Sequence, residues 1–125
     1  MSAIRRILVV DDNHDSADSL AMILKRIGYS VETAYGGSAA VTAFESFGPE
    51  AVLLDIGMPD MDGYQLAIAL RALPGYRGVP LVAVTGFALY DDRERALKSG
   101  FDAHLTKPIN PISLLDLLAG LRHES

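Results

Sequence analysis

Five polar residues, each close to the end of an apolar stretch, are the residues of this chain whose types could do chemistry. They are Asp11, Asp12, Asp55, Thr85 and Lys107. Taken singly, each has a simpler explanation, because aspartate and threonine at strand ends commonly form turns or cap helices. Taken together, they offer three carboxylates, a hydroxyl and an ammonium group, a combination that suits a hard cation and a phosphoryl group.

A cluster of three carboxylates would need a counter-charge. Near a protein surface, each pair within a few ångströms costs on the order of a few kcal/mol unless a cation or a proton intervenes. The chain has no cysteine, so oxygen atoms are the main ligands available for a metal. Mg²⁺ fits best, because it prefers one or two carboxylates, several waters and a ligand phosphate. Lys107 and the Thr85 hydroxyl would then contact phosphate oxygens, and Asp55 is the predicted nucleophile.

Short apolar stretches that lead into these polar residues predict the strands of a parallel sheet buried on both faces. We expect these strands over Ile4–Val10, Ala51–Leu54, Val79–Val84 and Ala103–Thr106. A fifth stretch, Ser30–Tyr35, alternates apolar and polar residues, which is typical of a less buried edge strand.

Between the strands the apolar spacing changes to that of a helix. Helices are expected over Leu20–Ile27, Ser38–Phe47, Leu66–Leu73, Leu89–Ser99 and Leu114–Leu121, the last capped by Asn110. Five strands alternating with five helices predict an α/β doubly wound fold with right-handed crossovers. A strand order of 2-1-3-4-5 would place the first and third strands side by side and so gather the three carboxylates.

Composition limits the classes of protein to which this chain can belong. A length of 125 residues predicts one domain over residues 1–125. No apolar run approaches the ~20 residues of a membrane span, and MSAIRRILVV does not resemble a signal peptide, so we expect a cytoplasmic protein without membrane insertion. A net charge of −5 and scattered basic residues argue against direct binding of nucleic acid.

Four motifs of the chain, LVVDDN, LLDIGMPDMDG, VTG and LTKP, resemble in order and spacing those of response-regulator receiver domains. The resemblance covers essentially the whole chain and implies a flavodoxin-like fold. It implies a two-component signalling switch, rather than an enzyme, that accepts a phosphoryl group on Asp55. The implied partners are a sensor histidine kinase or a histidine phosphotransfer protein, and a downstream protein target.

The same resemblance implies roles for the residues around Asp55. Asp12, Asp55 and the backbone carbonyl of Gly57 would hold Mg²⁺, and Asp11 would act largely through water. Thr85 and Lys107 would contact the phosphoryl group and take part in the switch. A cis bond between Lys107 and Pro108 is also implied, and the loop after the phosphoacceptor is matched by Met58, Pro59, Asp62 and Gly63.

Two features depart from the usual pattern of the family. His104 stands where an aromatic residue that moves on activation is common, so it is a candidate switch residue, although a structural role is as simple an explanation. Gly57 and Phe87 stand at positions that affect how long the phosphoryl group survives, and both are apolar here. This pairing predicts a long-lived phosphorylated form.

Other functions remain to be weighed against this one. An aspartate-nucleophile phosphatase with Mg²⁺ would need a second acid two residues after its nucleophile, where this chain has Asn13 or His14. The chain does not fit a flavin carrier, because the turn after its first predicted strand is acidic, whereas a phosphate-binding loop needs Gly, Ser and Thr donors there. A degenerate receiver that only docks to partners disagrees with the complete set of acids, threonine and lysine.

The sequence leaves two alternatives for the protein to which this domain belongs, and two for its last helix. The chain is either a single-domain regulator or a piece of a hybrid kinase. Ile112 and Leu115 lie off the apolar stripe of the last helix, so they predict an exposed surface for partners or for a phosphorylation-dependent dimer, with packing within the monomer as the alternative.

Overall fold

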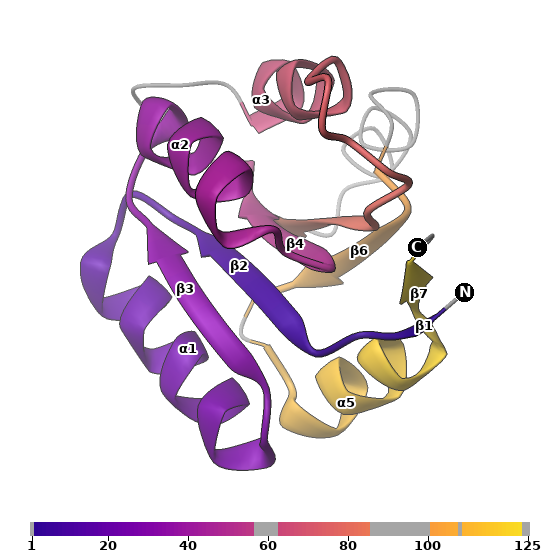
Figure 1. Ribbon diagram of the computed structural model, residues 1–125. Helices are drawn as coiled ribbons and strands as arrows, with labels where there is room; N and C mark the ends of the chain where they lie inside the picture. Colours follow the sequence, from indigo (N-terminus) through magenta and orange to yellow (C-terminus); the bar gives the residue numbers. More distant parts are fainter. Residues whose placement is uncertain (1, 57–62, 86–100, 108, 124–125) are drawn as a thin grey trace.

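A five-stranded parallel sheet forms the centre of the molecule (Figure 1). The computed structural model describes residues 2–56, 63–85, 101–107 and 109–123. The strands of the sheet are β2 (Arg6–Val10), β3 (Ser30–Ala34), β4 (Ala51–Asp55), β5 (Leu81–Thr85) and β6 (Ala103–Thr106). Their order is β3-β2-β4-β5-β6, which confirms the predicted 2-1-3-4-5 arrangement and places β2 beside β4.

Helices cover both faces of this sheet. One face carries α1 (His14–Ile27) and α5 (Pro111–Gly120), and the other carries α2 (Gly37–Phe47) and α3 (Gly63–Arg71). The described residues contain four helices, and the fifth predicted helix, over residues 89–99, lies outside them. No helix in the described segments combines the length and the apolar character that a membrane crossing requires.

Alternation along the strands explains why both faces are apolar. In β2, Ile7 and Val9 belong to the buried cluster under α1 and α5, whereas Leu8 and Val10 belong to the cluster under α2 and α3. Successive side chains of a strand point to opposite faces, so a strand covered on both sides must be apolar throughout. The register of the sheet is therefore set by burial on both faces.

Side-chain caps determine where two of the helices begin. The Asn13 side chain accepts the backbone N–H of Ser16 and so starts α1, well before the apolar residues from which the helix was predicted. Asn110 caps α5 by accepting the N–H groups of Ile112 and Ser113, which confirms its predicted role. Both caps lie at the end of the sheet that carries the polar residues.

Some element ends differ from those predicted. β2 begins at Arg6 rather than Ile4, because the Glu50 carboxylate accepts the N–H groups of Arg5 and Arg6 (2.9 Å each). β5 begins at Leu81, since the preceding proline has no N–H to donate to the sheet. α3 ends at Arg71. Directly after it, backbone N–H groups donate to the carbonyl three residues earlier, which gives a tighter turn than the four-residue spacing of an α-helix. A short antiparallel ribbon of β1 (Ser2–Ala3) and β7 (Arg122–His123) was not predicted.

The first residue of α3 lies so close to the end of β4 that it has no room for a side chain. A Cβ atom on Gly63 would lie 2.6 Å from the Cα atom of Ile56 and 3.0 Å from the carbonyl oxygen of Asp55. Both are backbone atoms, so they cannot turn aside as a flexible side chain could. Gly63 therefore allows the start of α3 to pack directly against the backbone of Asp55 and Ile56, at the end of β4.

Replacing Gly63 with alanine should destabilise the fold. The added methyl group must push α3 away from β4, so we expect Gly63→Ala to lower the free energy of unfolding by about 1–3 kcal/mol in urea titrations. Gly120→Ala is the matched control, because Gly120 also lies in a helix and a Cβ atom there would meet nothing within 4 Å. Equal stability of the two variants would show that α3 can shift without cost.

Candidate functional site

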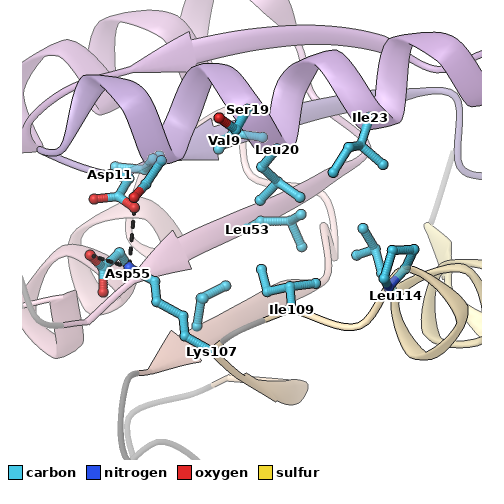
Figure 2. A pocket seen from close by; sticks show the side chains of 14 residues that line it. Val9, Asp11, Ser19, Leu20, Ile23, Leu53, Asp55, Lys107, Ile109 and Leu114 are labelled. Carbon is cyan, nitrogen blue, oxygen red and sulfur yellow. Dashed lines mark hydrogen bonds and ion pairs between the residues drawn. The ribbon is translucent and has the colours of Figure 1, made fainter.

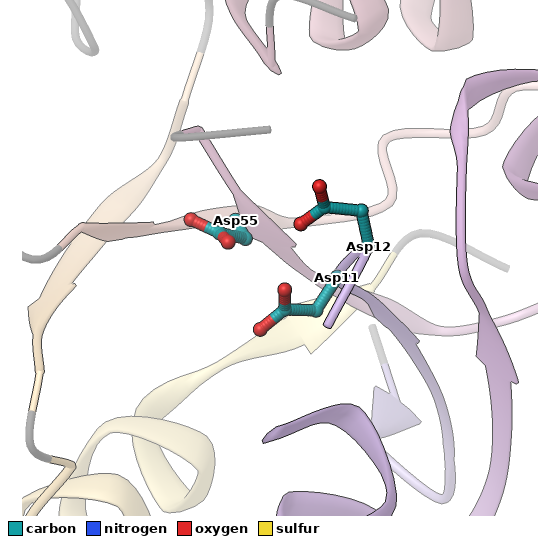
Figure 3. A group of neighbouring side chains, drawn as sticks. All are labelled: Asp11, Asp12 and Asp55. Carbon is teal, nitrogen blue, oxygen red and sulfur yellow. The ribbon is translucent and has the colours of Figure 1, made fainter. Parts of the chain in front are cut away.

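Three carboxylates converge at the carboxyl end of the sheet (Figure 3). Asp11 directly follows β2, Asp12 is the next residue, and Asp55 is the last residue of β4. Each offers a carboxylate oxygen, and these oxygens all lie within 4.8 Å of one another. Asp11 and Asp55 are buried and Asp12 is half-buried. The predicted acid cluster is therefore present, and it results from β2 and β4 being neighbours.

Hydrogen bonds hold the turn that carries two of these acids. The N–H of Asp11 donates to the carbonyl of Ala34 at the end of β3 (3.1 Å). The Asp11 carboxylate in turn accepts the N–H of Asn13 (3.0 Å). Because Asn13 caps α1, the turn between β2 and α1 is fixed at both ends, and Asp12 lies between the two attachments.

Lys107 supplies the positive charge of the site. Its Nζ atom donates to Oδ2 of Asp11 and to Oδ2 of Asp55, at 3.3 Å in each case (Figure 2). Burial by itself would lower the pKa of Lys107, but the negative charges of Asp55 and Asp11 outweigh it and raise the pKa above its ordinary value. The ammonium group therefore stays charged and faces the phosphoacceptor predicted from sequence.

The described part of the structure leaves some of the predicted site residues undecided. Thr85 is the last residue of β5, at the same end of the sheet as the acids, but its hydroxyl falls outside what is described. The predictions for the loop residues, the lifetime positions and the cis peptide bond also fall outside, since they concern Gly57, Met58, Pro59, Asp62, Phe87 and Pro108.

His104 lies within β6, paired in register with Ala83 of β5. Its side chain is half-buried and its Nε2 atom is shielded from solvent. This placement puts the residue inside the sheet rather than among the acids. Its predicted part in the switch stays a prediction.

The donor set of the cluster fits Mg²⁺. Its side-chain oxygens come from three carboxylates, and hard cations of this size prefer oxygen ligands. The Lys107 ammonium group bonds to two of the three carboxylates and supplies one positive charge against their three negative charges. A divalent cation would balance that excess and relieve the repulsion between Asp11, Asp12 and Asp55.

A groove of about 260 Å³ leads from this cluster along the surface between α1 and α5 (Figure 2). Asp11, Asp55 and Lys107 form its polar end. The rest of its wall is largely apolar and includes Leu20, Ile23, Leu53, Ile109 and Leu114. Asp11 and Asp55 therefore lie at one end of a largely apolar groove, which sequence patterns did not predict.

Two further residues near the acids were missed from sequence. Asn13 was considered only as the residue that stands where a phosphatase would need its second acid, although an asparagine before a helix is a recognisable cap signal. Tyr35 stacks on His14 beside the start of α1. No local signal could have found that pair, because the two residues lie on different elements.

Comparison with known proteins gives one consistent result. The family model of the response regulator receiver domain matches residues 7–119. A protein of 14.6 kDa from Leptolyngbya boryana is 39% identical over 90% of this chain and 86% of its own length. The sensor protein GacS of Pseudomonas syringae is 37% identical over 90% of this chain, but the match spans only 13% of that sensor protein.

Solved structures agree with the sequence matches. A CheY-like receiver domain protein of Methanospirillum hungatei superimposes with a TM-score of 0.82 at 34% identity, covering 93% of this chain and 91% of that one. The receiver domain of a sensor histidine kinase of Pseudomonas aeruginosa has the same TM-score and identity, covering 93% of this chain and 95% of that one. That domain was solved with a magnesium ion coordinated in its active-site cleft.

Mg²⁺ should stabilise the folded chain through Asp12. The cluster exists only in the native state, so Mg²⁺ at one hundred times its dissociation constant should add about 2.7 kcal/mol to the free energy of unfolding. Asp12→Asn removes one of three repelling charges, so it should raise the melting temperature without metal and abolish the response to Mg²⁺. Asp116→Asn, an equal change of charge on an exposed residue of α5, should leave that response unchanged. A normal Mg²⁺ response in Asp12→Asn would remove Asp12 from the site.

Proposed function

Because this chain belongs to the response regulator receiver domain family, we propose that it accepts a phosphoryl group from a phosphohistidine on Asp55. Mg²⁺ would be held by Asp12, Asp55 and the backbone carbonyl of Gly57, with Asp11 acting through water. The observation that carries the proposal is the convergence of three carboxylates, two of which, those of Asp11 and Asp55, accept hydrogen bonds from the Lys107 ammonium group. Receiver domains are two-component signalling switches rather than classical enzymes, and we propose that residues 1–125 form one such domain.

The transfer that we propose is a displacement at phosphorus. A carboxylate oxygen of Asp55 forms a bond to phosphorus while the bond from phosphorus to the imidazole nitrogen of the donor breaks, and the electron pair of that bond leaves with the imidazole. Lys107, which lies 3.3 Å from Asp55, would stabilise the charge on the phosphoryl oxygens. Bound Mg²⁺ would neutralise further charge on the same group.

The same residues would serve the return to the resting state and the switch. Hydrolysis of the aspartyl phosphate would use the charges that assist its formation, so the domain would promote both its phosphorylation and its dephosphorylation. Thr85 and His104 are the residues that we propose to respond to the phosphoryl group. Thr85 pairs in register with Thr106, the residue before Lys107, and His104 lies on the same strand, β6. The resulting change of conformation would control a downstream protein.

The donor that we propose is a sensor histidine kinase or a histidine phosphotransfer protein. The relatives include GacS and the transcriptional regulatory protein PrrA of Mycobacterium tuberculosis, and the matches span 13% and 43% of those two proteins. Both a single-domain regulator and a part of a hybrid kinase are compatible with these matches. Such donors take their phosphoryl group from ATP, so we propose that the domain acts in the cytoplasm. We propose no direct binding of nucleic acid.

The groove between α1 and α5 is the surface on which we propose that the protein donor docks. It leads to Asp55, and its wall includes Ile23, which is 39% exposed. An apolar surface that leads to the reacting group suits a protein donor, because docking there buries apolar area and brings the phosphohistidine to the acid. Ile112 and Leu115 are exposed, as predicted, and they would form the contact of any dimer of the phosphorylated protein.

A charge in the groove should separate protein donors from small ones. Ile23→Lys should slow phosphotransfer from a phosphohistidine protein about tenfold, which corresponds to a loss of about 1.4 kcal/mol in docking. It should leave phosphorylation by acetyl phosphate unchanged, because that donor needs no docking surface. Ile68→Lys is the control, since Ile68 is 56% exposed on α3 on the opposite face of the sheet. Equal rates of protein transfer in both variants would exclude the groove as the docking surface.

Asp55 should be the only residue that takes the phosphoryl group. With labelled acetyl phosphate, the wild type should accept one phosphoryl group per chain, and chelation of Mg²⁺ should prevent the reaction. Asp55→Asn should take no label, whereas Asp116→Asn should react like the wild type. Label on Asp55→Asn at the normal rate would refute the assignment. A wild type that binds Mg²⁺ but takes no label from any donor would instead be a receiver that only docks.

The phosphorylated form should be long-lived, because the residue types at two positions offer nothing to orient a hydrolytic water. Gly57 has no side chain for this purpose, and Phe87 adds an apolar ring. Positioning a reacting water is worth several kcal/mol when polar groups are available. Gly57→Asn combined with Phe87→Glu should therefore lose phosphate several times faster than the wild type at equal Mg²⁺, as followed by first-order decay of the label. An unchanged decay in a folded, fully phosphorylated double variant would mean that the lifetime is set elsewhere.

A further inference from the structure

An aromatic pair lies at the start of α1, on the side of the helix that faces β3. The ring of His14, the first residue of α1, stacks on the ring of Tyr35, which directly follows β3. The ring centroids are 3.8 Å apart and the ring planes differ by 9°. The stack connects the beginning of a helix to the end of a strand, beside the turn that carries Asp11 and Asp12.

The hydroxyl of Tyr35 adds a second connection to the same helix. It donates a hydrogen bond to Oδ1 of Asp18 (2.6 Å) and accepts one from the Thr33 hydroxyl (3.3 Å). His14 and Asp18 are four residues apart, so they lie on one face of α1, one turn from each other. Tyr35 therefore holds both the start of α1 and its second turn against the end of β3.

The contacts of Tyr35 hold the two backbone segments on either side of Asp12. Asp12 lies between Asp11, whose N–H is bound by the carbonyl of Ala34, and the first turn of α1. Ala34 directly precedes Tyr35 in the chain, and the His14 ring stacks on the Tyr35 ring. Both attachments of the turn that carries Asp12 therefore meet at Tyr35.

We propose that Tyr35 is a positioning residue for the Asp12 carboxylate. Through His14 and Asp18 it holds the first turns of α1 against the end of β3, and so it helps to set how Asp12 faces Asp11 and Asp55. The inference rests on the proposed Mg²⁺ site. Mg²⁺ requires near-ideal octahedral geometry at about 2.0–2.1 Å, so a small displacement of one ligand is enough to weaken binding.

The contacts of Tyr35 lie outside the core, so a positioning role can be told apart from a contribution to global stability. His14, Asp18, Thr33 and Tyr35 lie at the surface or are half-buried, outside the two buried clusters that make up the core. Loss of a surface contact is expected to open the structure locally rather than to unfold it. A change at Tyr35 should therefore affect Mg²⁺ binding more than global unfolding.

The test compares the dissociation constant for Mg²⁺, measured by calorimetric titration of the full chain, with the midpoint of thermal unfolding. Tyr35→Ala should raise the dissociation constant at least fivefold, and His14→Ala, which removes the other half of the stack, should also raise it. Tyr35→Phe keeps the stack and loses only the hydroxyl, so its constant should lie between those of Tyr35→Ala and the wild type. Val31→Ala changes a half-buried residue of β3 that packs on the core, so it should lower the unfolding midpoint and leave the dissociation constant unchanged.

Several outcomes would overturn the inference. One is a dissociation constant within twofold of the wild type in both Tyr35→Ala and His14→Ala. Another is an equal weakening in Val31→Ala at an equal loss of unfolding midpoint, because binding would then follow stability alone. If either of these outcomes occurs while the wild type binds Mg²⁺ and Asp12→Asn does not, the metal site stands and only the role of Tyr35 fails. A wild type that binds no Mg²⁺ would overturn both.

Discussion

Repulsion between carboxylates at one end of the sheet is the constraint on which the rest of this structure depends. Asp11 and Asp55 are buried and lie, with Asp12, within 4.8 Å of one another. Lys107 bridges two of them. Burial by itself would lower its pKa, but the charges of Asp55 and Asp11 and the hydrogen bonds to them together raise it. The native fold keeps negative charge together that an unfolded chain would separate. Stability given up at a site in this way is a common cost of function.

The buried sheet is what keeps those charges together. β2 and β4 are apolar on both faces, and their pairing in register places the residues at their carboxyl ends side by side. A shift of one residue would turn apolar side chains to the wrong face, so the register is strongly specified. Gly63 extends the same constraint beyond the strand, because it lets α3 pack against the backbone at Asp55.

One helix, α1, adjoins the acids, the contacts of Tyr35 and the groove. Its first turn follows the acids and is capped by Asn13. One side of it contacts Tyr35 through His14 and Asp18, and another side lines the groove through Ile23. A single rigid element thus links the geometry of the proposed metal ligands to the proposed donor surface. In a packed structure, a displacement of this helix would be felt at both places.

Local patterns of the sequence determined the elements and the chemistry of the site. Apolar runs and helical spacing predicted the five strands and the helices that are described, because burial on both faces leaves a period that can be recognised. The order of the strands was expected from the doubly wound fold class. Asp11, Asp12, Asp55 and Lys107 were found as a group because the carboxyl ends of parallel strands meet at one edge. The Asn110 cap was likewise visible, since a cap acts on its own neighbours in sequence.

Only the tertiary structure decided what depends on contacts between distant residues. The Lys107 bridge to two acids, the groove between α1 and α5, and the stack of His14 on Tyr35 all join residues that lie far apart in the chain. The start of β2 was displaced by the Glu50 carboxylate, more than forty residues away. Spacing along a chain reports which face of an element is buried, but it carries no information about which side chain from another element will meet that face.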